Sequence, residues 1–264
     1  MLPFGESFLA WIGSTAVPAF VGLALITVVG RRTSPRYSAA FALGIFFWFF
    51  VDTIQGSADL DVNAGFTGGI DQVVIVLLFV VGILFVFYAD KTAFSMTPAR
   101  EIGFVVPMLA ALAVGIHGLG EGTAFGNTAA LTSSTSLLDA FGGLSAGVAY
   151  ALHKMFEPMM VGAIYVAYSK GREAGMSTRA KEILILALLF VLPSLVGAAT
   201  GYYISYDATY FFALGTGTSI YAAFRLARQV LKAEGTPQNH EALKLSLALI
   251  VGFLLIYFAA LFHS

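Results

Sequence analysis

Two segments of the chain each place a histidine four residues before a glutamate. They are His117 and Glu121 in IHGLGEGTAFG, and His153 and Glu157 in LHKMFEPMMVG. Residues four apart lie one above the other on a single helix face, so two imidazoles and two carboxylates converge if the two faces meet. This donor set favours Zn²⁺ or Fe²⁺ over Mg²⁺ and Ca²⁺, which take all-oxygen shells. Cd²⁺, Mn²⁺ and Co²⁺ are also compatible with it.

The composition predicts that these segments lie in a membrane. Of 264 residues, 58% are hydrophobic and 11% are charged, with a mean hydropathy of +0.85, whereas a soluble domain is about 25% charged. Apolar stretches of roughly 20 residues, enough to cross hydrocarbon as a helix, recur eight times. The fifth is longer than one span needs, so we expect it to begin or end outside the hydrocarbon core. The stretches lie near 6–29, 38–56, 71–89, 102–125, 138–168, 182–204, 208–230 and 242–262.

The basic residues agree with eight crossings. Thirteen of the fourteen Lys and Arg residues fall in or beside alternate connections between the stretches, and short cytoplasmic loops collect such residues. This distribution predicts that both termini lie outside. The fourteenth, Lys154, lies within a predicted span, next to His153. The thirteen are Arg31, Arg32, Arg36, Lys91, Arg100, Lys170, Arg172, Arg179, Lys181, Arg225, Arg228, Lys232 and Lys244.

We therefore predict a single all-α polytopic membrane domain over residues 1–264, because the connections are too short for a separate soluble domain. No cationic segment precedes the first stretch and no small-residue cleavage site follows it, so we expect a retained helix and not a signal peptide. The chain has no Cys, which excludes disulfides and thiolate ligands. No basic run interleaved with aromatic residues suggests nucleic acid as a partner. The expected partners are the lipid bilayer and the metal ion.

The first three and last three stretches share short motifs in the same order. Pro18, Val21 and Gly22 recur at the same spacing in 193–197, Phe-Ala-Leu-Gly occurs at 41–44 and 212–215, and Val-Gly-x-Leu occurs at 81–84 and 251–254. The offsets are 175, 171 and 170. Five crossings separate the copies, so the copies run in opposite directions through the membrane, as in many transporters. The pattern predicts a 3+2+3 inverted-repeat bundle with helices 1–3 at about 6–89, helices 4–5 at about 102–168 and helices 6–8 at about 182–262.

These residues resemble the ZIP (Zrt- and Irt-like) family of divalent metal transporters, whose eight helices are arranged as 3+2+3 with metal bound between helices 4 and 5. The segment 117–122, His-Gly-Leu-Gly-Glu-Gly, resembles the family's helix 4 motif His-Asn-x-x-Asp/Glu-Gly. The segment 153–157, His-Lys-Met-Phe-Glu, resembles its helix 5 motif His/Gln-Asp/Glu-x-Pro-x-Glu. Segment 217–221 is similar to the Gly-Thr-x-x-Tyr of helix 7, and segment 193–201 to the Pro-x-Gly stretch of helix 6.

The differences from the family predict a single bound metal. Members with a two-metal centre use the Asn after the first His, an acid after the second His and an acid on helix 6. Here Gly118 and Lys154 stand at the first two positions, and we find no acid inside the sixth helix. A protonated lysine cannot ligate a metal and repels a second dication. The expected ligands of the one metal are His117, Glu121, His153 and Glu157, with Lys154 in the place of the second ion.

Four residues are candidates for supporting the metal ligands or for lining the path of the metal ion through the protein: Lys154, Gly118, Asp52 and Ser194. Lys154 is expected to balance Glu157 when the metal leaves. Gly118, Gly120 and Gly122 leave the fourth helix thin, so the fourth and fifth helices could approach closely, although plain helix packing is the commoner reason for such glycines. Asp52, near the outer end of the second stretch, either sits at the membrane interface or lines an entrance.

The sequence predicts a permease in the cell membrane, not an enzyme, that moves a divalent transition metal and carries no prosthetic group. The ZIP resemblance implies movement toward the cytoplasm. Three other classes stay open: a bis-histidine haem protein for electron transfer, a membrane metalloenzyme with three ligands and a water, and a retinal protein using Lys154. Glutamates one turn from both histidines argue against haem, and no His-Glu-x-x-His motif is present. A homodimer is also left open.

Overall fold

The computed structural model describes residues 2–63, 70–92, 103–131, 136–231 and 239–261, and every regular element in these ranges is a helix. Eight of these helices have 22 to 29 residues, the length that crosses a bilayer, whereas α5 has four. The helices are α1 (Phe4–Gly30), α2 (Pro35–Asn63), α3 (Ile70–Thr92), α4 (Val105–Leu131), α5 (Leu137–Ala140), α6 (Leu144–Ser169), α7 (Met176–Tyr203), α8 (Thr209–Leu231) and α9 (Asn239–Ala260).

The chain is an all-α integral membrane protein. Among the described residues, five helices (α1, α3, α4, α7 and α9) are long and apolar enough to cross a membrane. The helix α6 is less apolar because it carries His153, Lys154 and Glu157, and all three are buried inside the bundle. Ionisable residues in membrane proteins face the bundle interior in this way because lipid cannot solvate them.

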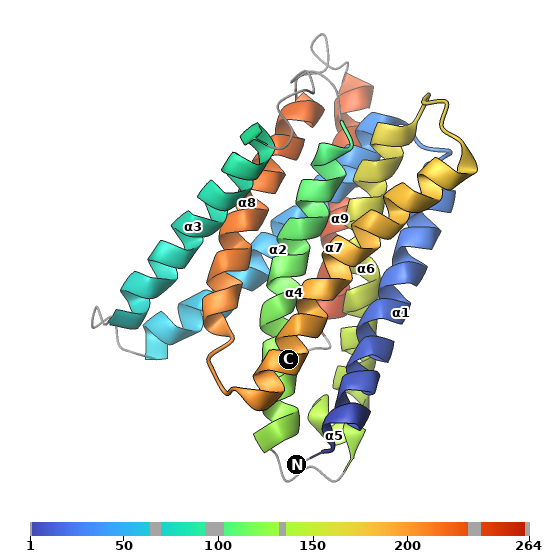
Figure 1. The fold of residues 1–264 in the computed structure, drawn as a ribbon. Coiled ribbons are helices and arrows are strands. Elements are labelled where there is room, and N and C mark those ends of the chain that lie inside the picture. Colours follow the sequence, from blue (N-terminus) through green and yellow to red (C-terminus); the bar gives the residue numbers. More distant parts are fainter. Residues whose placement is uncertain (1, 64–69, 93–102, 132–135, 232–238, 262–264) are drawn as a thin grey trace.

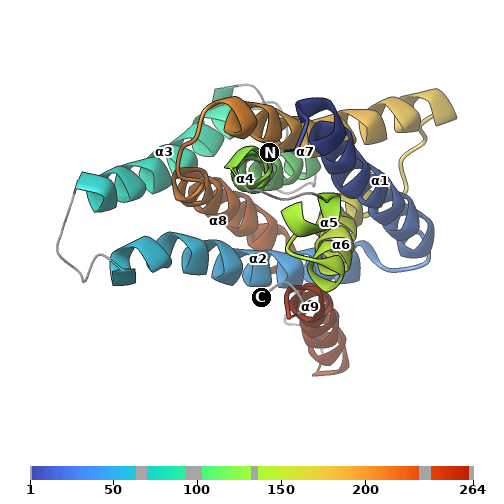
Figure 2. The same cartoon turned by 90° about the horizontal axis from the view of Figure 1, so that it is seen from below.

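The two helices that carry the histidines lie at the centre of the bundle. The helices α4 and α6 are mostly buried, whereas α3 and α9 are mostly exposed at the periphery. The helix α1 begins and α9 ends toward the same end of the bundle, and the α1–α2 and α6–α7 connections lie at the opposite end (Figure 1). The view along the bundle shows α4 surrounded by α1, α7 and α8 (Figure 2).

Glycines allow the main helix pairs to pack backbone against backbone. The largest interfaces are those of α4 with α7, α1 with α6, α2 with α9, and α3 with α8. In the α4–α7 interface, a Cβ added to Gly122 would overlap the Ser194 carbonyl, and one added to Gly197 would overlap the Leu119 carbonyl. Small residues permit such close approach in membrane helices, where no hydrophobic effect draws helices together.

The glycines of α4 face different neighbours from those predicted. We expected Gly118, Gly120 and Gly122 to bring the fourth and fifth helices close together. In the structure Gly118 and Gly122 lie against Ser194 of α7, and Gly120 lies against Phe212 of α8. That prediction was therefore wrong about the partner, because these glycines face α7 and α8 and not α6.

Two carboxylates anchor helix ends at the end of the bundle that carries the basic residues. Asp90 of α3 accepts a hydrogen bond from Tyr221 (2.7 Å) and pairs with Arg225 (3.2 Å), both on α8. Glu182 of α7 accepts a hydrogen bond from Tyr165 of α6 (3.0 Å) and pairs with Arg172 (2.5 Å). The expectation that the sixth helix contains no acid was therefore wrong, because α7 begins at Met176 and includes the buried Glu182. The hydrogen bond to Glu182 raises the pKa of Arg172 above its usual value.

The long fifth stretch, predicted near 138–168, is two helices. The chain turns at Gly142 and Gly143, whose φ angles of +80° and +106° lie in the region that glycine adopts without strain. The Ser136 hydroxyl caps α5 by accepting a hydrogen bond from the Asp139 amide at 3.3 Å. The part of this stretch that is long enough to cross a bilayer is therefore α6 alone. Asp52 falls within α2, but its side chain lies outside the described residues.

We expect Gly197→Ala to weaken the α4–α7 interface. The new methyl group would overlap the Leu119 carbonyl, and overpacking of this kind costs about 1–3 kcal/mol. The measurement is the melting temperature in detergent. The matched control is Gly13→Ala in α1, where a Cβ meets nothing within 4 Å and alanine favours the helix by up to about 1 kcal/mol. Equal melting temperatures for the two variants would contradict this account.

Candidate metal centre

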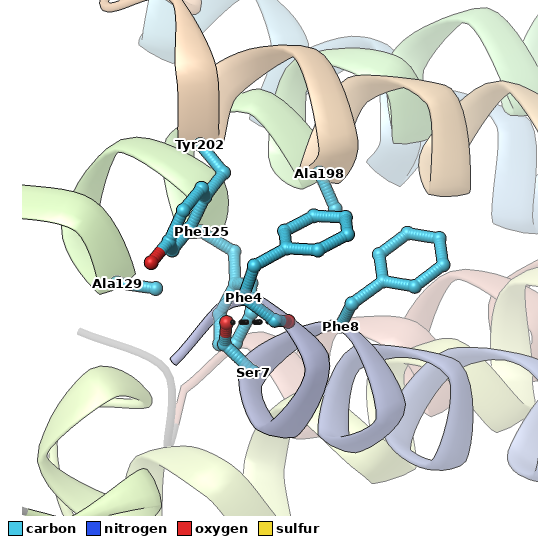
Figure 3. Close-up of a pocket in the computed structure, with 8 residues that line it drawn as sticks. Phe4, Ser7, Phe8, Phe125, Ala129, Ala198 and Tyr202 are labelled. Carbon is cyan, nitrogen blue, oxygen red and sulfur yellow. Dashed lines mark hydrogen bonds between the residues drawn. The ribbon is translucent and has the colours of Figure 1, made fainter. Parts of the chain in front are cut away.

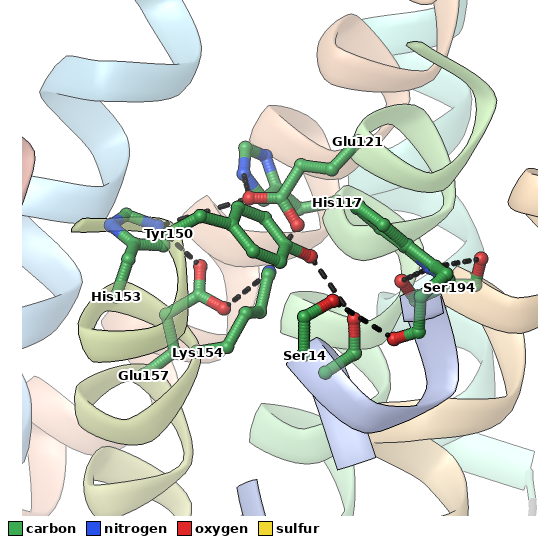
Figure 4. Close-up of polar contacts among 10 residues, drawn as sticks. Ser14, His117, Glu121, Tyr150, His153, Lys154, Glu157 and Ser194 are labelled. Atoms are coloured by element: carbon green, nitrogen blue, oxygen red, sulfur yellow. Dashed lines mark hydrogen bonds and ion pairs between the residues drawn. The ribbon is translucent and has the colours of Figure 1, made fainter. Parts of the chain in front are cut away.

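The four predicted ligands come from two neighbouring helices and point toward one another (Figure 4). His117 and Glu121 lie on α4, and His153 and Glu157 lie on α6. Both histidines and Glu157 are buried, and the side chain of Glu121 is 15% exposed. The i, i+4 spacing stacks each histidine on its own glutamate, and contact between α4 and α6 brings the two stacks together.

One oxygen of each glutamate faces the imidazoles. Glu121 Oε1 lies 3.5 Å from His117 Nε2 and 3.8 Å from His153 Nε2, and Glu157 Oε1 lies 3.0 Å from His153 Nε2. Two ligands of one tetrahedral Zn²⁺, each about 2.0–2.2 Å from the metal, stand about 3.4 Å apart. The observed separations bracket that value. Ligand atoms of three of the four residues, His117, Glu121 and Glu157, all lie within 4.8 Å of one another. His153 is not in this group, although its Nε2 lies near an oxygen of each glutamate.

The other oxygen of each glutamate faces the ammonium group of Lys154. Lys154 Nζ contacts Glu121 Oε2, and it lies 2.6 Å from Glu157 Oε2. The lysine therefore bridges α4 and α6 through both carboxylates. A buried charge is expensive unless it is paired and hydrogen-bonded. Lys154 gives each carboxylate both an opposite charge and a hydrogen bond. It also fixes the rotation of the two carboxylates, so that their Oε1 atoms remain turned to the imidazoles.

Two aromatic rings enclose the same ammonium group. The ring centroids of Tyr150, on α6, and Phe190, on α7, each lie 5.7 Å from Lys154 Nζ. This distance is within the range at which a ring face attracts a cation. The Tyr150 hydroxyl is 3.2 Å from the Thr15 hydroxyl of α1. Lys154 is thus held by groups from three helices and tied indirectly to a fourth.

A layer of aromatic side chains lies between the lysine and the end of the bundle where the chain begins. Trp11 stacks on Phe125 with ring centroids 4.5 Å apart and lies 4.9 Å from the Tyr150 ring, and Phe141 lies 4.9 Å from Phe125. A small pocket between α1, α4 and α7 ends against Phe125 (Figure 3). The residues that line this pocket include none of the four candidate ligands.

The structure places two of the other predicted residues beside the site. A Cβ added to Gly118 would lie 3.3 Å from Ser194 Cβ and 3.8 Å from Glu121 Oε2, so this glycine leaves space between the carboxylate and α7. The Ser194 hydroxyl accepts a hydrogen bond from the Trp11 indole at 3.1 Å. A role of either residue in a path stays a prediction, as does that of Asp52.

The sequence interpretation missed the groups around the lysine. Tyr150 lies one turn before Lys154 on the same helix, and that i, i+4 spacing is a signal that could have drawn attention to it. Phe190 and Thr15 carry no such signal, because only the packing of α7 and α1 against α6 brings them near.

Comparison with known proteins identifies no relative. The chain matches no protein-family model and no curated protein sequence.

We expect Lys154→Met to destabilise the metal-free protein. Methionine has a similar length but no charge, so the variant leaves two buried carboxylates without their cation, and breaking a buried pair costs about 3–5 kcal/mol. The measurement is unfolding by denaturant in detergent with a chelator present. The matched control is Lys181→Met, since Lys181 is exposed. If the two variants unfold at the same denaturant concentration, Lys154 does not compensate the carboxylates.

Proposed function

We propose that the protein is a permease that carries one divalent transition metal ion, Zn²⁺ or Fe²⁺ first, through the site between α4 and α6. The observation that carries the proposal is the group of His117, Glu121 and Glu157, whose ligand atoms lie within 4.8 Å of one another inside the bundle, with His153 Nε2 3.0 Å from Glu157 and 3.8 Å from Glu121. These groups suit a borderline cation. In this proposal the metal is the transported substrate and not a resident cofactor.

The proposal includes eight spans arranged as a 3+2+3 inverted repeat, and the helix contacts support it. Gly22 of α1 packs on the Met155 carbonyl of α6, as Gly197 of α7 packs on the Leu119 carbonyl of α4. Met155 follows Leu119 by 36 positions, and the same offset relates His153 to His117 and Glu157 to Glu121. A two-fold axis in the membrane plane would therefore exchange the two halves of the site.

The outer helices show the same two-fold relation between the two halves of the chain. Gly44 of α2 packs on the Leu249 carbonyl of α9, as Gly217 of α8 packs on the Phe79 carbonyl of α3. By these contacts the equivalent of Gly44 is Gly217, two positions beyond the Gly215 that the Phe-Ala-Leu-Gly match suggested. The repeat is thus supported by backbone contacts that do not depend on that short motif.

The charges of the site favour a carrier over a storage site. Two carboxylates neutralise a dication, which lowers the cost of holding it away from water. Lys154 then leaves the loaded site with one positive charge in excess, and this excess weakens binding. Ligation by nitrogen and oxygen without thiolate also permits release, and protonation of the ligands would promote it because they bind metal only when deprotonated.

The resemblance to ZIP transporters extends the proposal to direction and orientation. It implies movement toward the cytoplasm, with both termini outside and the basic connections inside, in the cell membrane. The helix α1 begins and α9 ends toward one end of the bundle, and the α1–α2 and α6–α7 connections lie toward the other (Figure 1), an arrangement that an even number of crossings requires.

The geometry favours this function over a haem protein. A haem between two axial histidines needs the space between their ligating nitrogens. Here Glu121 Oε1 occupies that space, at 3.5 Å from one histidine and 3.8 Å from the other. The visible spectrum of the purified protein decides the matter, since a Soret band would exclude the permease proposal. A metalloenzyme or a retinal protein would instead be revealed by metal-dependent turnover or by colour after addition of all-trans retinal.

We expect His153→Ala and Glu157→Ala to reduce Zn²⁺ uptake into proteoliposomes to the level of protein-free vesicles, because each removes a ligand from a four-ligand site. The matched controls are His240→Ala and Glu173→Ala, which change exposed residues of the same types. Size-exclusion chromatography verifies folding of every variant. Uptake at the wild-type rate by both site variants would remove the site from the transport path.

We expect Lys154→Asp to raise the number of bound Zn²⁺ ions from one to two. The substitution replaces the ammonium with a third carboxylate next to the Oε2 atoms of Glu121 and Glu157, and three carboxylates supply the oxygens and charge that a second dication needs. Elemental analysis after dialysis gives the count. An unchanged stoichiometry in a folded variant would refute the view that Lys154 takes the place of the second ion.

A further inference from the structure

The ammonium group of Lys154 fills a cage that its neighbours would also offer to a free ion. Two carboxylate oxygens contact it, from Glu121 and Glu157. The rings of Tyr150 and Phe190 lie 5.7 Å from it. Lys154 itself is 1% exposed, so the cage is closed to bulk water. Figure 4 shows the lysine passing alongside the Tyr150 ring to reach the two carboxylates.

We propose that this cage is an alkylammonium site, filled by the chain's own lysine, and that Tyr150 and Phe190 reserve it for a monovalent cation. The inference rests on the proposed function, because it concerns the cation position beside the transported metal. It goes further by naming the two rings as the residues that make this position selective for an ammonium group.

The chemistry of the two aromatic rings explains why the cage prefers an ammonium group to a dication. An aromatic face attracts an ammonium group through its quadrupole, and this attraction strengthens when water is excluded. A small dication instead requires oxygen or nitrogen donors around most of its surface. In the cage the rings occupy positions where such donors would stand. A second dication would therefore lose water on the side of the rings and would need a further ligand there, which the wild-type chain does not supply.

The position of the Tyr150 ring is fixed from outside the cage. Its hydroxyl group lies 3.2 Å from that of Thr15 on α1, and its ring lies 4.9 Å from Trp11. Thr15 contributes a hydrogen bond but no wall of the cage. Removing the Thr15 hydroxyl and removing the Tyr150 ring are therefore separable changes.

The test uses Lys154→Ala, which deletes Cγ, Cδ, Cε and Nζ. Propylammonium has the same four heavy atoms, and propan-1-ol is its uncharged counterpart. In metal-free detergent solution with a chelator, calorimetry should show saturable binding of propylammonium to the variant but not to the wild-type protein, and no binding of propan-1-ol. Adding Tyr150→Leu or Phe190→Leu should weaken that binding about tenfold, the size of a desolvated cation–π contact.

Two further variants separate the ring from its hydrogen bond. Tyr150→Phe keeps the ring and Thr15→Val removes the partner hydroxyl, so in the Lys154→Ala background both should change the affinity for propylammonium by less than about threefold. Equal weakening by Tyr150→Phe, Thr15→Val and Tyr150→Leu would overturn the role of the rings. Absence of propylammonium binding to a folded Lys154→Ala protein would overturn the cage itself.

A second measurement links the cage to the metal. Lys154→Ala should bind Zn²⁺ at least about tenfold more tightly than the wild-type protein, because it lacks the positive charge that opposes the dication, and propylammonium should reverse this gain whereas propan-1-ol should not. If the wild-type protein binds no Zn²⁺, the proposed function is overturned. Binding of propylammonium to the metal-free Lys154→Ala protein would still show whether the cage accepts an ammonium group. If Lys154→Ala does not fold, Tyr150→Leu is compared in the wild-type and Lys154→Met backgrounds, and equal destabilisation in both would overturn the proposal.

Discussion

The structure depends on keeping two carboxylates charged inside a bundle that lipid surrounds. Glu157 is fully buried and Glu121 nearly so, and neither could remain ionised there without a compensating cation. Lys154 provides that cation for both at once, because it contacts the Oε2 atom of each. The remaining oxygens are left facing the imidazoles. A single ion-paired lysine thus determines both the stability of the empty site and the direction in which its donor atoms point.

This constraint explains why the polar helices lie at the centre and are packed through glycine. The helices α4 and α6 cannot face lipid with their ionisable residues, so apolar helices must surround them. Each central helix has a glycine-bearing partner, α7 for α4 and α1 for α6, and the contacts run between backbones. Backbone contact leaves little freedom for the helices to slide. The ligands on α4 and α6 are therefore positioned by rigid helix pairs and not by loops.

Much of this could be predicted from the sequence, because the strongest signals are local. Hydrophobic length placed the ends of the eight long helices to within seven residues, and the i, i+4 spacing placed each histidine over its glutamate. Other features depend on how helices pack. The glycines of α4 indicated that another helix packs closely against α4, but they did not indicate that this helix is α7. The break at Gly142–Gly143 lay within an apolar stretch that hydropathy alone could not divide. The rings around Lys154 became visible only when α6 and α7 were placed together.

The two halves of the site differ at one position, and that difference has a physical reason. His153 and Glu157 correspond to His117 and Glu121, but Lys154 corresponds to Gly118. Two lysines would place two ammonium groups against two carboxylates and leave no net charge to attract a dication. Two glycines would leave two buried carboxylates with no cation in the empty site. One lysine and one glycine avoid both outcomes, since the cation compensates both carboxylates while the glycine leaves space beside Glu121. The asymmetry thus reconciles a stable empty site with an attractive one.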